Sequence, residues 1–150
     1  MKKAPVNYVD NKEFLALLIA YIDARKFSIE NKTKIPPIPN EIGHIFIQMA
    51  NKLSTRFNFV NYTYRDERVS DGILNAIEAV HKFNPELSSN PFGYFTKIIY
   101  WAFVRRIERE KRDHKMRDDV MFDMTNDFYS TQDGESYDLS KDETYIWYNN

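Results

Sequence analysis

Apolar residues recur every three or four positions in four segments of this 150-residue chain, and this spacing limits what the chain can fold into. The four apolar stripes cover residues 14–22, 42–53, 69–80 and 92–103. Such spacing places apolar side chains on one face of an α-helix, whereas a half-buried strand requires strict alternation, which the sequence does not show. The sequence therefore predicts an all-α fold, a small helical bundle of about four helices.

Helix boundaries are indicated by capping residues and by prolines. The segment KIPPIPN (34–40) holds three prolines, which remove backbone donors and push the preceding residues out of the helical region, so we expect a linker there. The fourth helix should end near residue 117, followed by a loosely ordered acidic linker over 118–137 that begins the C-terminal tail. Residues whose side chains suit the N-cap position, directly before a helix, are Asp10 or Asn11, Asn40 and Asn90.

Charge is unevenly distributed along the chain. The net charge is −1, but residues 118–150 contain nine acids and one base, so the remainder of the chain is basic. A basic body with an acidic tail suggests nucleic acid as one partner and a different partner for the tail. The alternative is that the tail is only a solvated extension that aids solubility.

Several classes of protein are disfavoured by what the sequence lacks. It has no cysteine, no glycine-rich phosphate loop and no nucleophile elbow, and its three histidines lie far apart. We therefore expect no enzyme, no metal and no cofactor. No apolar segment follows the first lysines, as it would in a signal peptide, and the apolar run over 14–22 is too short to cross a bilayer. A cytoplasmic protein without a membrane partner is the expectation.

The fourth helical segment carries a second row of residues opposite its apolar stripe. Tyr94, Lys97, Trp101 and Arg105 follow one another at helical spacing, where an amphipathic helix is usually only polar. Rings stack on unpaired bases and cations hold phosphates, so this row suits single-stranded nucleic acid. Alternatively, the two rings pack beneath another helix or a loop.

A basic run follows directly after this row. Residues 105–117 contain seven bases and three acids. Alone, such a run is usually a solvated helix end whose cations complement the helix dipole. After an aromatic row, it is better interpreted as an extension that follows the phosphate backbone.

Five segments in fixed order together cover roughly residues 53–112. They read LSTRFNF (53–59), SDGI (70–73), AIEAVHKFN (76–84), NPFGYFT (90–96) and AFVRRIEREK (102–111). These segments resemble the core region of bacterial RNA polymerase sigma factors and are similar, more closely, to the late-transcription sigma factors of T4-like bacteriophages. The resemblance implies that residues 1–117 form a helical domain like sigma factor region 2.

The resemblance also implies a role for the third and fourth helices. The third would dock on the clamp helices of the host polymerase β′ subunit through Glu67, Ser70, Asp71, Ile73 and Asn75, although Ile73 replaces a residue that is usually polar. The fourth would bind the non-template strand of a −10-like promoter element, with an adenine captured by its aromatic cluster. The implied DNA-binding residues are Phe92, Tyr94, Phe95, Lys97, Ile98, Trp101, Arg105, Arg106, Arg109 and Arg112.

The sequence departs from housekeeping sigma factors in two places. Their paired wedge tryptophans align with Ile98 and Ile99, so either an aliphatic wedge or Trp101 takes this role, or melting is helped by something else. We expect no domain that reads the −35 element, because the tail after residue 117 is short and acidic. Its last segment, 138–150, resembles an acidic-hydrophobic peptide that binds a phage sliding clamp through Leu139, Tyr145, Ile146, Trp147 and Tyr148.

Alternatives to the clamp peptide are a contact with the polymerase β flap or a terminal helix that folds back on the bundle. The resemblance as a whole implies a phage late sigma factor that recruits host core polymerase and melts an A/T-rich −10-like element. The first alternative is a polymerase-binding adaptor or inhibitor that has the fold but does not recognise promoters. The second is a generic single-strand-binding module.

Overall fold

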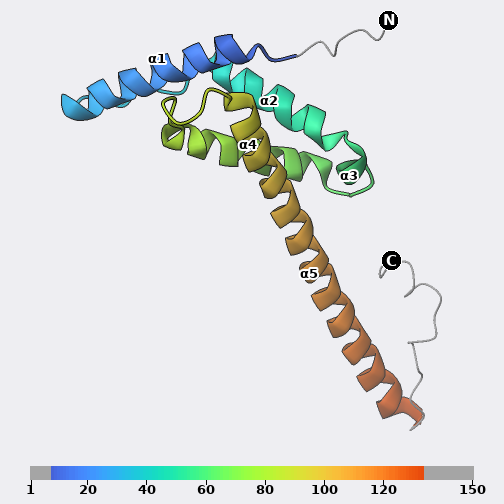
Figure 1. Ribbon diagram of the computed structural model, residues 1–150. Helices are drawn as coiled ribbons and strands as arrows, with labels where there is room; N and C mark the ends of the chain where they lie inside the picture. Colours follow the sequence, from blue (N-terminus) through green and yellow to red (C-terminus); the bar gives the residue numbers. More distant parts are fainter. Residues whose placement is uncertain (1–7, 134–150) are drawn as a thin grey trace, which may run out of the picture. The chain divides into compact units, whose positions relative to one another are not determined.

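The computed structural model describes residues 8–133 of the chain, with side chains up to residue 128. Every regular element in that range is helical, so the predicted all-α class is confirmed. The chain divides into two compact units, Met1–Ile107 and Glu108–Asn150. The elements are α1 (Asn11–Glu30), α2 (Asn40–Ser54), α3 (Phe57–Val60), α4 (Arg65–Ala79), the 3₁₀ turn η1 (Val80–Lys82) and α5 (Pro91–Asp133) (Figure 1).

Two of the predicted helix caps are present. The side chain of Asp10 accepts a hydrogen bond from the backbone N–H of Lys12 at 2.9 Å, which satisfies a free donor at the start of α1. Asn90 accepts one from Gly93 N–H at 3.0 Å in the same way at the start of α5. The prediction for Asn40 is wrong by one position, because Asn40 is already the first residue of α2.

The beginnings of α1 and α5 are joined by a pair of asparagines. The Nδ2 atom of Asn11 donates to Oδ1 of Asn90 at 3.0 Å. The Oδ1 atom of Asn11 accepts from the backbone N–H of Phe92 at 3.2 Å. Asn11 therefore helps to cap α5, which lies far away in the sequence.

Three phenylalanine rings from three helices form the centre of the first unit, in which α2 lies alongside α4 (Figure 1). Phe14 of α1, Phe46 of α2 and Phe95 of α5 are fully buried. The ring centroids of Phe46 and Phe95 are 4.8 Å apart, and that of Phe14 lies 6.0 Å and 5.7 Å from them, respectively. Edge-on and tilted ring pairs of this kind add about 0.5–1.5 kcal/mol each beyond area burial. These contacts fix the inward face of the first turns of α5 against α1 and α2.

Gly72 allows α4 to approach the inward face of α5 closely. A Cβ atom at this position would lie 2.7 Å from Cε1 of Phe103 and 2.9 Å from Cγ2 of Ile99. Both of these side chains are fully buried, so neither can move aside without disturbing the core. The glycine is required here because of the space that these two side chains occupy.

A buried arginine organises the loop between α3 and α4. The side chain of Arg68 is fully buried, and its guanidinium donates hydrogen bonds to the backbone carbonyls of Phe59, Tyr62 and Thr63. The carbonyl of Phe59 also accepts the backbone N–H of Tyr62 at 3.2 Å, whereas Tyr62 and Thr63 lie in the turn beyond α3. The next residue, Tyr64, has a left-handed backbone with φ of 56° and lies directly before α4. Arg68 thus ties the turn to the helix that follows it.

Helix α5 continues to Asp133, well beyond residue 117. The expectation of a loop from residue 118 onward is therefore wrong for residues 118–133. No glycine or proline occurs between residues 94 and 133, so nothing in this stretch breaks the helix. His114 and Asp118, one turn apart, also form a side-chain contact of 2.8 Å that stabilises it.

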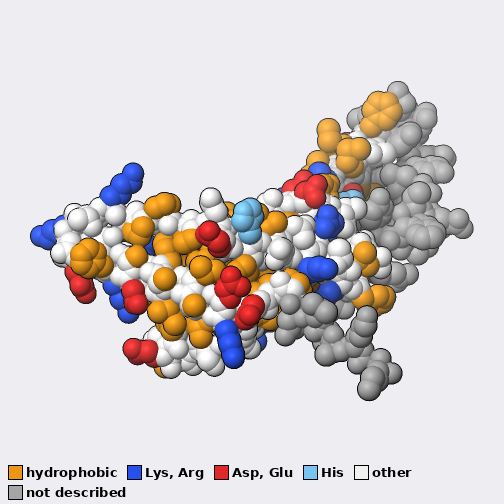
Figure 2. Space-filling view, turned by 90° about the horizontal axis from the view of Figure 1, so that it is seen from above, with side chains coloured by type: hydrophobic (Ala, Val, Ile, Leu, Met, Phe, Trp, Pro, Cys, Tyr) orange, Lys and Arg blue, Asp and Glu red, His pale blue; other side chains and the backbone are white. Residues whose placement is uncertain are grey.

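The surface mixes apolar and charged side chains. On the face shown in Figure 2, hydrophobic side chains form a broad band over which single acidic and basic side chains are scattered. Among the described large apolar residues, Phe57 and Leu87 have the largest exposed fractions, at 86% and 85%. No helix in the described part of the chain combines the length and the apolar character needed to cross a membrane.

Candidate nucleic-acid interface

Most of the rings at the start of α5 serve the core of the first unit. Phe95 and Phe103 are fully buried. Tyr94 is half-buried, with its centroid 5.2 Å from that of Phe83, and Tyr100 packs at 5.4 Å against Phe59. This corrects the expectation for Phe95, whose ring presents no face to solvent and therefore does not contact bases in this conformation.

Trp101 differs from these rings because it points outward. Its side chain is 56% exposed, and its ring lies edge-on to that of Tyr100 at 5.4 Å. Lys97, one turn earlier, is also exposed and forms no ion pair with any described residue. The predicted row of Tyr94, Lys97, Trp101 and Arg105 is therefore at the surface, with Tyr94 partly covered. An exposed indole beside a free ammonium can stack on a base and neutralise a phosphate.

Arg105, the last residue of this row, and its neighbour Arg106 are both bound to α4. Arg105 is exposed, and its Nη2 atom donates to Oδ1 of Asn75 at 3.0 Å. Arg106 Nη1 lies 3.4 Å from Oδ2 of Asp71, and both side chains are partly exposed. Asn75 in turn donates to the backbone carbonyl of Asp71 at 2.7 Å. Two predicted DNA-binding residues thus contact two predicted polymerase-binding residues, an arrangement that the sequence pattern did not reveal.

The remaining predicted DNA-binding residues lie in different surroundings. Ile98 is half-buried against the core, and Ile99 beside it is fully buried. Phe92 is half-buried, with its ring edge-on to Tyr8 at 5.8 Å. Arg109 and Arg112 belong to the second unit, in which both are exposed.

The outward face of α4 is more apolar than the predicted polymerase-binding residues indicate. Glu67 and Ser70 are exposed, whereas Ile73 packs partly against the core. Leu74 is 54% exposed and Ile77 37% exposed, and neither was among the predicted contacts. Leu74 could have been found from the sequence, because it lies outside the apolar stripe of this helix. Glu67, Ser70, Leu74 and Ile77 follow one another at helical spacing and form what we call the outer face of α4.

The predicted clamp-binding residues Leu139, Tyr145, Ile146, Trp147 and Tyr148 lie outside the described residues. Within residues 8–133 no three histidine, aspartate or glutamate side chains gather in a way that could hold a metal ion.

No protein-family model matches the sequence, and no curated protein is significantly similar to it.

Proposed function

We propose that this protein is a promoter-specificity subunit of the phage late sigma type, which binds a host core RNA polymerase and melts an A/T-rich −10-like element. The main support is the outward position of Trp101 and Lys97 on a helix whose opposite face is anchored in an aromatic core. A rigidly held helix keeps a stacking ring in position, so less entropy is lost when an unpaired base binds.

Trp101 is the best candidate for the ring that stacks at the edge of the melted region. Ile99 is fully buried and Ile98 is half-buried, so neither offers a large surface to DNA. Stacking of a base on an aromatic side chain contributes about 1–3 kcal/mol, comparable with the few kcal/mol needed to flip a base out of a duplex. Half-exposed Tyr94 can add a second ring.

The outer face of α4 is the proposed contact with the polymerase. It combines two polar residues, Glu67 and Ser70, with the exposed apolar side chains of Leu74 and Ile77. Apolar anchors surrounded by polar groups are typical of protein interfaces. Asp71 supports this face from within, because its carboxylate is engaged by Arg106.

A second candidate function is a polymerase-binding adaptor without promoter recognition. It is favoured by the burial of Phe95 and by the engagement of Arg106 with Asp71, which leave fewer groups for DNA than the sequence suggests. An adaptor would bind the polymerase without producing promoter-dependent transcripts.

Transcription in vitro tests the proposal. Host core polymerase, the protein and a template with a TATA-rich element should produce a transcript from that element, with thymines in the melted region open to permanganate. Polymerase binding without a transcript or melting would support the adaptor instead. For the C-terminal segment, deletion of residues 139–150 should leave basal transcription unchanged and remove stimulation by a sliding clamp.

A further inference from the structure

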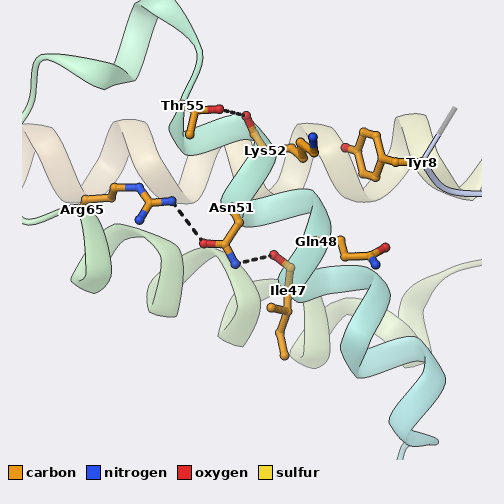
Figure 3. Close-up of a pocket in the computed structure, with 7 residues that line it drawn as sticks. All are labelled: Tyr8, Ile47, Gln48, Asn51, Lys52, Thr55 and Arg65. Carbon is orange, nitrogen blue, oxygen red and sulfur yellow. Dashed lines mark hydrogen bonds between the residues drawn. The ribbon is translucent and has the colours of Figure 1, made fainter. Parts of the chain in front are cut away.

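A two-lobed groove lies beside the start of α5 in the first unit. The larger lobe has a volume of about 430 Å³ and is lined by α2, Tyr8 and Arg65 (Figure 3). The smaller lobe, of about 150 Å³, lies between α2, Arg56 and the α5 residues Phe92 and Thr96. Tyr8 and Lys52 line both lobes, so the two lobes meet at these side chains. We call the two lobes together the Tyr8 groove.

The described charged side chains that line the Tyr8 groove are all cations. They are Lys52, Arg56 and Arg65, and no carboxylate of the described residues lines either lobe. Asp66 approaches Arg65 to 3.9 Å, but its side chain is almost fully solvated, so it neutralises little of this charge. The groove therefore favours an anionic ligand.

Two of the cations are held in place before any ligand binds. Arg65 donates from Nε to the hydroxyl of Ser54 at 3.0 Å and from Nη2 to Oδ1 of Asn51 at 3.3 Å. The ammonium of Lys52 lies 5.8 Å from the ring centroid of Tyr8, within the range of a cation–π contact. Figure 3 shows Lys52 directed toward Tyr8 and Arg65 directed toward Asn51. Pre-positioned cations lose less entropy when they bind a phosphate.

The groove also offers a surface for a flat ring and groups for its edge. Tyr8 is 41% exposed and Ile47 is 44% exposed, so both present apolar area to the larger lobe. The carboxamide of Gln48 lies in the same lobe and forms no hydrogen bond with any described residue. Asparagine and glutamine side chains pair readily with base edges.

The hydroxyl of Tyr8 stays neutral at ordinary pH. Partial burial raises the pKa of Tyr8, and the charge of Arg56 opposes this only in part. A neutral phenol can donate or accept a hydrogen bond and does not repel an anion.

We propose that the Tyr8 groove binds one nucleotide unit of a single-stranded DNA, with the base against Tyr8, Ile47 and Gln48 and its phosphate against Lys52 and Arg65. It is a second subsite, separate from Trp101 and Lys97 on the outward side of α5. The inference rests on the proposed function in one respect, because it requires that the protein binds single-stranded DNA.

Two measurements on the full chain test the groove. In the first, binding of a fluorescent single-stranded oligodeoxynucleotide is followed over a salt series. K52Q and R65Q should each reduce the slope of log affinity against log salt by about 0.7, because each removes one phosphate contact. The matched control K26Q removes an exposed lysine of α1 outside the groove and should leave the slope unchanged. Unchanged slopes in both groove variants would overturn the proposal.

The second measurement locates the base directly. An oligonucleotide that carries 5-iodo-deoxyuridine is crosslinked by light, and the adduct is mapped by mass spectrometry. The expected adduct is on Tyr8 and disappears in Y8L. Adducts only on Tyr94 or Trp101 would overturn the groove but leave the proposed function intact. An adduct on Tyr8 together with an unaffected W101A variant would support the groove and count against the role of Trp101.

A competition experiment distinguishes a strand from a free nucleotide. Deoxyadenosine monophosphate and inorganic phosphate are added to the complex with the oligonucleotide. Weak competition by both supports a subsite for a strand. Competition by the mononucleotide as strong as that by an unlabelled oligonucleotide would assign the same groove to a free nucleotide.

Discussion

Arg106 of α5 lies 3.4 Å from the carboxylate of Asp71 on α4, so residues expected to bind two different partners bind each other. The contact bridges two helices and is reinforced by the neighbouring hydrogen bond from Arg105 to Asn75 at 3.0 Å. A substitution at Asp71 therefore removes a contact between α4 and α5, and it also alters any surface of α4 that faces a polymerase.

This relationship predicts that D71A and R106A have similar effects on polymerase binding. If Asp71 supports polymerase binding only by holding α4 against α5, loss of either side chain of the pair should weaken polymerase binding to the same degree. Because both side chains are partly solvated, the pair should contribute only about 0.5–1 kcal/mol to stability. A double-mutant cycle in urea unfolding measures this coupling, and a polymerase-binding assay compares the two variants. Loss of binding in D71A with normal binding in R106A would show that Asp71 contacts the polymerase itself.

Replacement of Trp101 by alanine should impair promoter opening but not stability, whereas replacement of Phe95 should lower stability. W101A should retain the stability of the native protein, because the ring is exposed, but should reduce promoter opening about tenfold through lost stacking. F95A should lower the free energy of unfolding by about 3–5 kcal/mol, because it leaves a cavity among Phe14, Phe46 and Phe83. Thermal unfolding and permanganate footprinting separate the two effects. As a control, L87A removes an even more exposed apolar side chain, which lies in the turn before α5 and outside this row, and should change neither quantity.

Gly72 should not accept even a methyl group without cost. The added Cβ would lie within 3 Å of Phe103 and Ile99, so G72A should destabilise the protein by about 1–3 kcal/mol. This loss outweighs the gain of up to about 1 kcal/mol that alanine usually brings to a helix interior. Chemical unfolding measures the net change in the free energy of unfolding. G43A is the matched control, since a Cβ at Gly43 meets no atom within 4 Å. A more stable G72A would show that α4 and α5 can move apart freely.

Removal of the buried guanidinium should destabilise the turn before α4. In R68M the apolar volume is roughly kept, but the carbonyls of Phe59, Tyr62 and Thr63 lose their hydrogen bonds from the guanidinium. We expect a loss of at least about 2 kcal/mol, because hydrogen bonds to a charged group contribute about 1.5–3 kcal/mol each. Hydrogen exchange should show faster opening around α3 than in the wild type. Unchanged exchange and stability would mean that the turn is held by other contacts.

Local features of the sequence predicted much of the fold. The spacing of apolar residues located the main helices, and Asp10 and Asn90 were identified as caps because their short side chains reach the first free backbone donors. The end of α5 was predicted too early. The acidic composition of residues 118–133 suggested a loop, but this stretch contains no glycine or proline that would end the helix. The row around Trp101 was located correctly, but its interpretation as a DNA contact stays a prediction.

The sequence by itself determined where the main helices lie and which side of each is largely apolar, because these depend on neighbours a few positions away. Only the tertiary structure decided which rings stay in solvent, which arginine is buried and which cations are bound by α4. Phe95 and Trp101 are both aromatic residues of one helix, yet one is sealed against Phe46 and the other is exposed. Burial depends on which helices pack against each residue, and those partners come from distant parts of the chain.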